Sequence, residues 1–469
     1  MKKLLCILLT LMLLAGCTAA PAETTGPAQS AEVTIRLSDD GTAFPADSGV
    51  STSEEATYTQ VRITRPGTYR ITGSLSAGQI AVDLGEEAKT DPGAAVLLIL
   101  DGAEITCREA PAILFSNVYE SGQPDGPAGA HILLAQDSEN RVAGSHTEDF
   151  DGAVYSRMSM KLGGTGSLRI EGDNEGLCSE LHLTIDGGNL TIESGNDGIN
   201  ANADGQSAIT VNGGTLGITV TGTTGEGDGI DSNGSIVING GIVEAFACAD
   251  SGDFGLDADL GVQLSGGTVI ATGNMLDRIS GDQTHVLFSF AEKQQDFPFA
   301  LKDQTGEPVL EGLASNGFTH LLLSSPELTE GTYTLWSGDI QYEGAAGMGG
   351  GFFGDQGPIE RPDWPGRDDG DVQIPPQPTM PVVTQGTVQP PAGEQPENMP
   401  VPPMTGEGTE MPTPPIPEGS ENMPMPQPPA GVQPPQDSKQ PVQILTGTLS
   451  TDFPIREGAN FFTNLRPVA

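Results

Sequence analysis

Short runs of alternating apolar and polar residues recur along residues 31–281, and glycines separate them. Alternation with a period of two predicts β-strands. Each of four Gly-Gly pairs has one such run before it and another after it, and the pairs return at a nearly constant step. They are Gly187-Gly188, Gly213-Gly214, Gly240-Gly241 and Gly266-Gly267. A fixed step of this length indicates a repeat architecture.

A third short strand completes each repeat, and its apolar residue follows a glycine. Its representatives are Val154, Leu177, Ile199, Ile230 and Leu256, which are 22 to 31 residues apart. Three strands in such a unit are typical of one coil of a right-handed parallel β-helix. A single coil cannot bury its own apolar face, so coils stack and share one core. Propeller blades and calcium-binding nonapeptide rolls have different periods. We therefore expect an all-β protein, with a right-handed parallel β-helix over residues 31–281.

The pattern changes after residue 281. Residues 282–342 contain four further apolar runs and are expected to form a small antiparallel β module. Residues 343–445 are rich in glycine and proline, with 24 of the 37 prolines between residues 354 and 441, and this composition predicts disorder. Residues 446–469 become apolar again, and we expect them to return as a strand that packs on the small module.

The N-terminus has the features of a lipoprotein signal peptide. Lys2 and Lys3 precede an apolar run, which ends in Leu14-Ala15-Gly16-Cys17. Residues 1–16 are thus predicted to be a signal peptide, with Cys17 as the lipid anchor and residues 17–30 as a tether. These features predict an extracytoplasmic lipoprotein at the cell surface, attached to the membrane through Cys17. Three cysteines remain in the body of the chain, an odd number without zinc-site spacing, so each is expected to be a buried free thiol.

The charge balance limits the partners. The chain has 63 acidic and 20 basic residues, a formal net charge of −43. Such a surface repels nucleic acid and suits divalent cations. We expect a monomer that binds no nucleic acid.

Aligning the repeats on their third strand places acidic and amide side chains in columns. The residues expected to hold metal are Asp197, Asn200, Asp228, Asp231, Asp253, Asp257 and Asp259. Parallel strands stack about 4.8 Å apart, and two carboxylates at that distance repel by roughly 3.5 kcal/mol at an effective dielectric of 20. Calcium binds oxygen ligands at about 2.3–2.6 Å, so an ion midway between two such carboxylates would contact both. The columns predict structural Ca²⁺, although Asp and Asn are also common in turns that bind nothing.

An ordered series of motifs over roughly residues 50–340 resembles a family of bacterial carbohydrate-binding domain-containing proteins with a polysaccharide-lyase-like β-helix. The motifs are Gly67-Thr68-Tyr69-Arg70-Ile71-Thr72-Gly73, Leu98-Ile99-Leu100-Asp101-Gly102, Ala110-Pro111-Ala112-Ile113 and Gly227-Asp228-Gly229-Ile230. The resemblance implies a right-handed β-helix, bound calcium and binding of a cellulose- or pectin-like polysaccharide. The Pro-rich segment departs from the family pattern.

Three functions remain open at the level of sequence. A pectate-lyase-like enzyme needs a basic residue near its calcium, yet residues 170–277 contain 17 acidic residues and no Lys or Arg. Arg157, Lys161 and Arg169 lie one to two repeats before the predicted metal columns and could in principle reach over. The sequence therefore favours a polysaccharide-binding protein without catalysis. The alternatives are a polysaccharide lyase and a surface adhesin or spacer, and the residues that contact sugar are not identifiable.

Overall fold

The computed structural model describes residues 31–347 and 448–468, and they are almost entirely β-strand. The one helix among them is a short 3-10 helix, η1 (Glu86–Thr90). No helix in the described part of the chain is both long and apolar enough to cross a membrane. The expected signal peptide (1–16), Cys17, the tether (17–30) and nearly all of the Gly/Pro-rich segment (343–445) lie outside the described residues.

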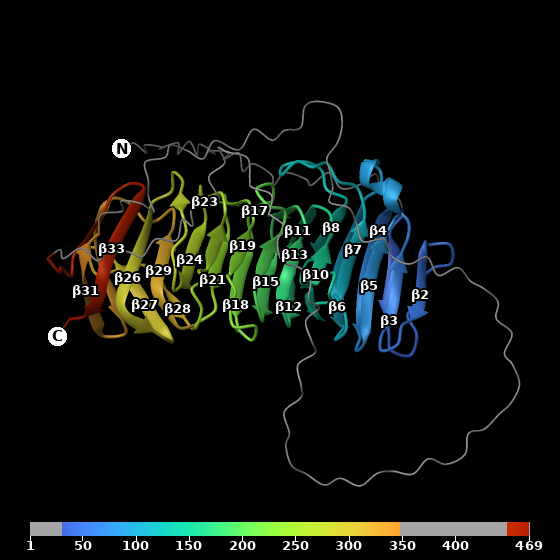
Figure 1. Cartoon of the computed structure of the whole chain (residues 1–469), viewed down its shortest axis with the longest axis horizontal. Helices are drawn as coiled ribbons and strands as arrows, with labels where there is room; N and C mark the ends of the chain where they lie inside the picture. The colour runs from blue at the N-terminus through green and yellow to red at the C-terminus, as the bar shows by residue number, and fades with distance from the viewer. Residues whose placement is uncertain (1–30, 348–447, 469) are drawn as a thin grey trace, which may run out of the picture. The chain divides into compact units, whose positions relative to one another are not determined.

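Successive coils contribute strands to three rows (Figure 1). Except for the pairing of β2 with β3, each strand pairs in parallel with its equivalent in the next coil. The first row comprises β1 (Val33–Leu37), the first part of β4 (Gly67–Leu75), the first part of β6 (Val96–Thr106), β8 (Ala130–Leu134), β11 (Met160–Gly164), β14 (His182–Ile185), β17 (Ala208–Val211), β20 (Ser235–Ile238), β23 (Gly261–Leu264) and β25 (Ile279–Ser280).

The second row follows the first along the chain. It comprises the second parts of β4 and β6, then β9 (Glu139–Gly144), β12 (Ser167–Gly172), β15 (Asn189–Ser194), β18 (Thr215–Val220), β21 (Ile242–Phe246) and β24 (Thr268–Gly273). Because β4 and β6 run through both rows, the two rows belong to one 24-stranded sheet.

The third row is a separate nine-stranded sheet. It comprises β2 (Val50–Glu54), β3 (Thr59–Ile63), β5 (Gly78–Asp83), β7 (Ile113–Asn117), β10 (Gly152–Ser156), β13 (Glu175–Ser179), β16 (Ile199–Ala201), β19 (Ile230–Ser232) and β22 (Leu256–Ala258). All of its pairings are parallel except that of β2 with β3. Neither sheet closes on itself within the described residues.

Apolar side chains form continuous interior columns along the stack. In the nine-stranded sheet, Leu177, Ile199, Ile230 and Leu256 are in register and fully buried. Burying one such side chain contributes about 1.5–3 kcal/mol, so the columns stabilise each coil only when its neighbours are present. The expected free thiols, Cys107, Cys178 and Cys248, are buried and unpaired.

The Gly-Gly pairs lie at the corner between the first and second rows. The second glycine of each pair has a positive φ, for example 91° at Gly214. A Cβ on Gly214 would also lie 2.6 Å from the carbonyl oxygen of Gly188 in the preceding coil. Both the backbone conformation and the close stacking therefore require glycine. Next to this corner, the amides of Asn212 and Asn239 donate along an exposed ladder that begins at Asp186.

A second hydrophobic core lies at the C-terminal end of the stack. The strands around it are β26 (His285–Gln294), β27 (Phe297–Lys302), β28 (Pro308–Ala314), β29 (Phe318–Ser324), β30 (Gly331–Ser337), β31 (Ile340–Ala346), β32 (Phe453–Ile455) and β33 (Ala459–Pro467). β29 pairs with β24, so this module continues the 24-stranded sheet. The C-terminal strand β33 lies between β26 and β31, and β32 pairs with β30.

The module is larger than the sequence predicts. Two of its strands, β28 and β31, were not expected, and β33 pairs with β26 in parallel although the module was expected to be antiparallel. β28 begins with Pro308, a position where proline is tolerated, and contains Gly312, which ordinarily weakens a strand. Pairing with β27 nevertheless places its Leu310 and Ala314 in the core.

Candidate metal centre

The outward face of the nine-stranded sheet changes from apolar to acidic along the stack. Its register places Tyr155, Cys178, Asn200, Asp231 and Asp257 in one column, one residue from each of five successive coils. Asp231 and Asp257 are therefore direct vertical neighbours on β19 and β22. The sequence spacing predicted that these two residues align, and the strand register confirms it.

A second acidic column precedes the strands, where backbone amides of the next coil stabilise its carboxylates. The backbone N–H of Asp228 donates to Oδ1 of Asp197 at 2.7 Å, and that of Phe254 donates to Oδ1 of Asp228 at 2.6 Å. Asp253 lies one residue out of step, and its Oδ2 accepts from the N–H of Gly227 at 2.6 Å. Hydrogen bonds of this kind favour the charged carboxylate, so they partly offset the repulsion along the column.

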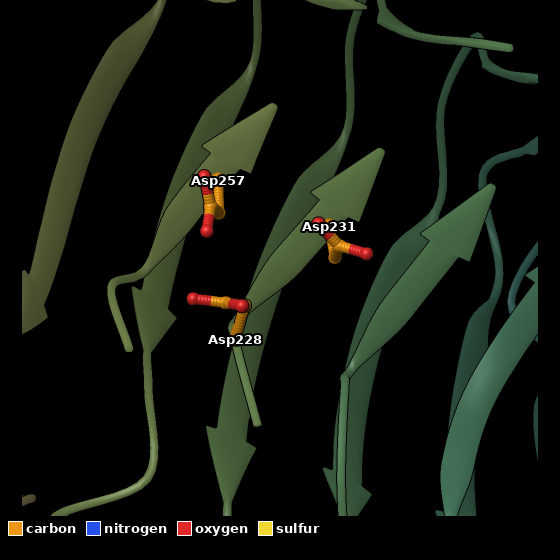
Figure 2. Close-up of side chains that lie close together, drawn as sticks. All are labelled: Asp228, Asp231 and Asp257. Atoms are coloured by element: carbon orange, nitrogen blue, oxygen red, sulfur yellow. The ribbon is translucent and has the colours of Figure 1, made fainter. Parts of the chain in front are cut away.

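Three carboxylates from the two columns converge on one point. Oxygen atoms of Asp228, Asp231 and Asp257 all lie within 4.8 Å of one another (Figure 2). Asp228 is buried, whereas Asp231 and Asp257 are half-buried, so the cluster is open on its outer side. Two oxygens bound to one calcium ion, each at about 2.4 Å, can be no more than about 4.8 Å apart. The separations are therefore compatible with three ligands to a single ion.

Burial is the main electrostatic feature of the cluster. It raises the pKa of Asp231 to about 8, with further contributions from Asp197 and Asp257. Burial also raises the pKa of Asp228 well above its usual range, and Asp257 and Asp197 add to the shift. Charged carboxylates are thus costly here unless a cation neutralises them.

Glu175, which the sequence-based site omitted, belongs to the same region. Burial raises its pKa to about 8. The amide of Asn200 donates to Oε1 of Glu175 at 2.7 Å and to Oδ2 of Asp197 at 3.1 Å. Oε2 of Glu175 and Oδ1 of Asn200 are buried without a hydrogen-bond partner. Buried acceptors without a donor are rare, and oxygen atoms in this state suit a hard cation such as calcium.

Asp277 is a further acidic residue that the sequence did not single out. Burial, followed by repulsion from Asp257, raises its pKa to about 7. Its Oδ2 accepts from the N–H of Ala258, one residue after Asp257. The only sequence signal for Glu175 was its alignment with Asp197 and Asp228. Asp277 lies between β24 and β25, in the last coil of the stack.

The structure brings only some of the seven predicted metal ligands together. Asp228, Asp231 and Asp257 form the cluster, and Asp197 and Asn200 lie beside it through the contacts described above. Asp253 accepts from the backbone of the neighbouring coil, and Asp259 is exposed; neither belongs to the three-carboxylate cluster. Cys17 lies outside the described residues.

The raised pKa values predict how the metal-free protein responds to pH. An unfolded Asp or Glu titrates near pH 4, whereas the pKa of Asp231 and that of Glu175 are about 8 in the fold. The folded state therefore binds more protons than the unfolded state up to about pH 8, and the free energy of unfolding falls as pH rises. Urea denaturation of chelator-treated protein should show lower stability at pH 8.5 than at pH 7, because the two carboxyl groups lose their protons over this interval.

The variant Asp231→Asn is the control, because it removes one of the titrating groups. Its loss of stability between pH 7 and pH 8.5 should be smaller than that of the wild type. A metal-free wild-type protein that is equally or more stable at pH 8.5 would contradict this electrostatic description.

Comparisons with known proteins confirm the family that the motifs suggested. Residues 57–287 match the model of a family described as carbohydrate-binding domain-containing protein. A relative from Acetivibrio thermocellus with the same description is 28% identical over 194 residues, which cover 39% of this chain and 61% of the relative. This chain thus spans less than two thirds of the relative's length.

A solved structure, the gadolinium derivative of the polysaccharide lyase-like protein from C. thermocellum, is 25% identical to this chain. The alignment covers 51% of this chain and 93% of that chain, with a TM-score of 0.35. Residues 57–287, just under half of the chain, are thus similar to the family of carbohydrate-binding domain-containing proteins.

Proposed function

We propose that this protein binds polysaccharide without cleaving it, on a right-handed parallel β-helix that calcium stabilises. Carbohydrate binding is supported by the family that residues 57–287 match. One observation supports both calcium binding and the absence of catalysis. It is the convergence of Asp228, Asp231 and Asp257 in a stretch of the chain without any Lys or Arg.

The β-helix is inferred from the connections between the three rows. Each coil passes through one strand of every row and then returns beside its starting strand, as from β13 through β14 and β15 to β16. Connections between parallel strands of one sheet are right-handed in about 98% of cases. Coils of this kind in succession amount to a right-handed parallel β-helix.

Calcium fits the donor set for two reasons. The cluster offers only oxygen ligands, which hard divalent cations prefer. An ion would also neutralise carboxylates that burial otherwise keeps protonated. Asp228, Asp231 and Asp257 would hold the ion, and the oxygens of Glu175 and Asn200 without partners are further candidate ligands. Bound calcium would join successive coils and so stabilise the stack.

The surroundings of the cluster argue against a polysaccharide lyase. Proton abstraction needs a base such as Lys or Arg within reach of the substrate. Lys161 and Arg169 are on β11 and β12 of the other sheet, and Arg169 pairs with Glu171 and Glu193. Arg157 follows β10 of the same sheet, where its guanidinium lies 4.9 Å from the ring centre of Phe150. Arg278 lies nearer to the cluster along the chain, and its guanidinium donates to the carbonyl oxygen of Asp259 at 3.1 Å. We therefore favour a cation-stabilised scaffold over an active site.

We further propose that the chain is exported as a monomeric lipoprotein and attached to the cell surface through Cys17. The support is the lipobox-like sequence Leu14-Ala15-Gly16-Cys17 after an apolar run. Mass spectrometry of the N-terminal peptide should find diacylglycerol on Cys17, and Cys17→Ser should release the protein from the membrane. An unmodified Cys17 in membrane-associated protein would refute the anchor.

Calcium should bind the protein and raise its melting temperature. At a free calcium concentration 100 times Kd, binding to the folded state alone adds about 2.7 kcal/mol of stability. The variants Asp231→Asn and Asp257→Asn each remove a charged ligand, so we expect at least tenfold weaker binding in calorimetric titration. Their melting temperatures should respond less to calcium.

Asp186→Asn is the matched control, since Asp186 is exposed on the other sheet and interacts with Asn212. It makes the same chemical change on the same stack, and calcium affinity should be unchanged. If Asp231→Asn and Asp257→Asn bind calcium as tightly as Asp186→Asn does, the proposed calcium site is refuted.

Polysaccharide binding can be tested by co-sedimentation with insoluble cellulose and with cross-linked polygalacturonate, with and without calcium. The wild-type protein should sediment with at least one of the two. Incubation for a day should produce neither new reducing ends nor absorbance from unsaturated uronates. Chain cleavage would favour the lyase, and failure to bind any glycan would favour an adhesin or spacer.

A further inference from the structure

A groove crosses the outer face of the second row of strands, away from the metal centre. It has a volume of about 510 Å³ and crosses β6, β9, β12 and β15, of which β6, β12 and β15 are labelled in Figure 1. Ligand sites in proteins commonly have volumes of about 300–1,000 Å³. The groove is on the 24-stranded sheet, whereas the aspartate cluster is on the nine-stranded sheet.

Small residues and one buried asparagine shape the groove. Gly102 has a φ of 72° and interrupts the register between β4 and β6, and it lines the groove together with Ala103. Oδ1 of Asn140 accepts from the N–H of Ala103, and its Nδ2 donates to the carbonyl oxygen of Ser167 at 3.0 Å. Asn140 therefore links three successive coils, so the floor of the groove is a fixed part of the fold.

The two walls are rows of side chains at positions i and i+2 of successive strands. One wall consists of Glu139, Ser167 and Asn189, and the other of Arg141, Arg169 and Thr191. Residues two apart on a strand point to the same face, and equivalent residues repeat about every 4.8 Å. The groove therefore runs along the stack, and its hydrogen-bonding groups recur at a spacing close to the length of one sugar unit.

The wall ends where the side chains become small. Thr191 is in register with Gly217 on the next coil, which carries no side chain, so the second wall stops there. The groove thus spans four coils and would accommodate a short run of sugar units.

The arginines of the groove are held in place by glutamates. Arg141 and Arg169 are directly in register, and among the described strand pairings they are the only two arginines stacked in this way. The guanidinium of Arg141 pairs with Glu171, and that of Arg169 pairs with Glu171 and Glu193 at 2.6 and 2.7 Å. Rigid guanidinium groups lose less entropy when they donate to a ligand.

The charge around the groove favours an uncharged ligand. Two arginines face Glu104, Glu139, Glu171 and Glu193, so carboxylates are in excess, and the whole chain is strongly acidic. A polyuronate would meet net repulsion in this groove. Hydroxyl groups, by contrast, can both donate to the glutamates and accept from the arginines and Asn189.

We propose that this groove binds an uncharged, hydroxyl-rich polysaccharide that lies along the stack. The inference rests on the proposed polysaccharide binding and adds its location and ligand class. It separates sugar binding from the metal, since the groove and the aspartate cluster lie on different sheets.

Calorimetric titration of the full chain with cellohexaose, in buffer containing calcium, tests this inference. Asn189→Trp places a bulky side chain in the groove at an exposed position, where it should not disturb the core. We expect at least tenfold weaker binding. Thr191→Trp, on the opposite wall, should have the same effect, and it provides a second reading if the first variant does not fold.

Thr215→Trp is the matched control. Thr215 is exposed and directly in register with Asn189 on the next coil, but it lies outside the groove. Its affinity for cellohexaose should equal that of the wild type, and circular dichroism and melting temperature should show that all variants are folded.

The possible results separate this inference from the proposed function. If the folded variants Asn189→Trp and Thr191→Trp both bind cellohexaose as tightly as the wild type, the groove is not the binding site. Binding of polygalacturonate but not of cellohexaose would overturn it as well, while the proposed function would stand. Wild-type protein that binds neither these ligands nor cellulose would refute both.

Discussion

Parallel stacking in register is the constraint on which the rest of this structure depends. A residue on one coil has its equivalents about 4.8 Å above and below it, so every favourable or unfavourable contact is repeated along a column. Leu177, Ile199, Ile230 and Leu256 show the favourable case, because identical apolar positions bury one another. For acidic residues the same repetition brings like charges together.

The fold offsets this repulsion in different ways at different places. At Asp197 and Asp228, backbone N–H groups of the next coil donate to the carboxylates. Along the exposed ladder, Asn212 and Asn239 alternate donor and acceptor within one column. In the second row of the 24-stranded sheet, glutamates neutralise the stacked Arg141 and Arg169. At Asp231 and Asp257, a divalent cation is the proposed solution.

The two candidate sites differ because their faces of the stack differ. The aspartate cluster is partly buried, and its oxygens lie close enough together for one ion. The groove is open and carries both donors and acceptors in two rows, an arrangement suited to an extended chain of hydroxyl groups. Under the two proposals, one scaffold of stacked coils holds a stabilising ion and a ligand at sites whose geometries do not depend on each other.

The sequence by itself determined the repeat, the all-β class and which residues share a column. Those features follow from strand alternation and from the fixed spacing of the Gly-Gly pairs, both of which can be read along the chain. It correctly aligned Asp231 with Asp257 and placed Asp253 one residue out of step. Only the tertiary structure decided which acids converge, since burial and side-chain direction depend on neighbouring coils. Glu175 is buried beside Asn200, Asp259 is exposed, and Asp277 accepts from the N–H of Ala258, next to Asp257. The groove likewise could not be predicted from the sequence. Its walls are rows of single residues that lie far apart along the chain and meet only when the coils stack.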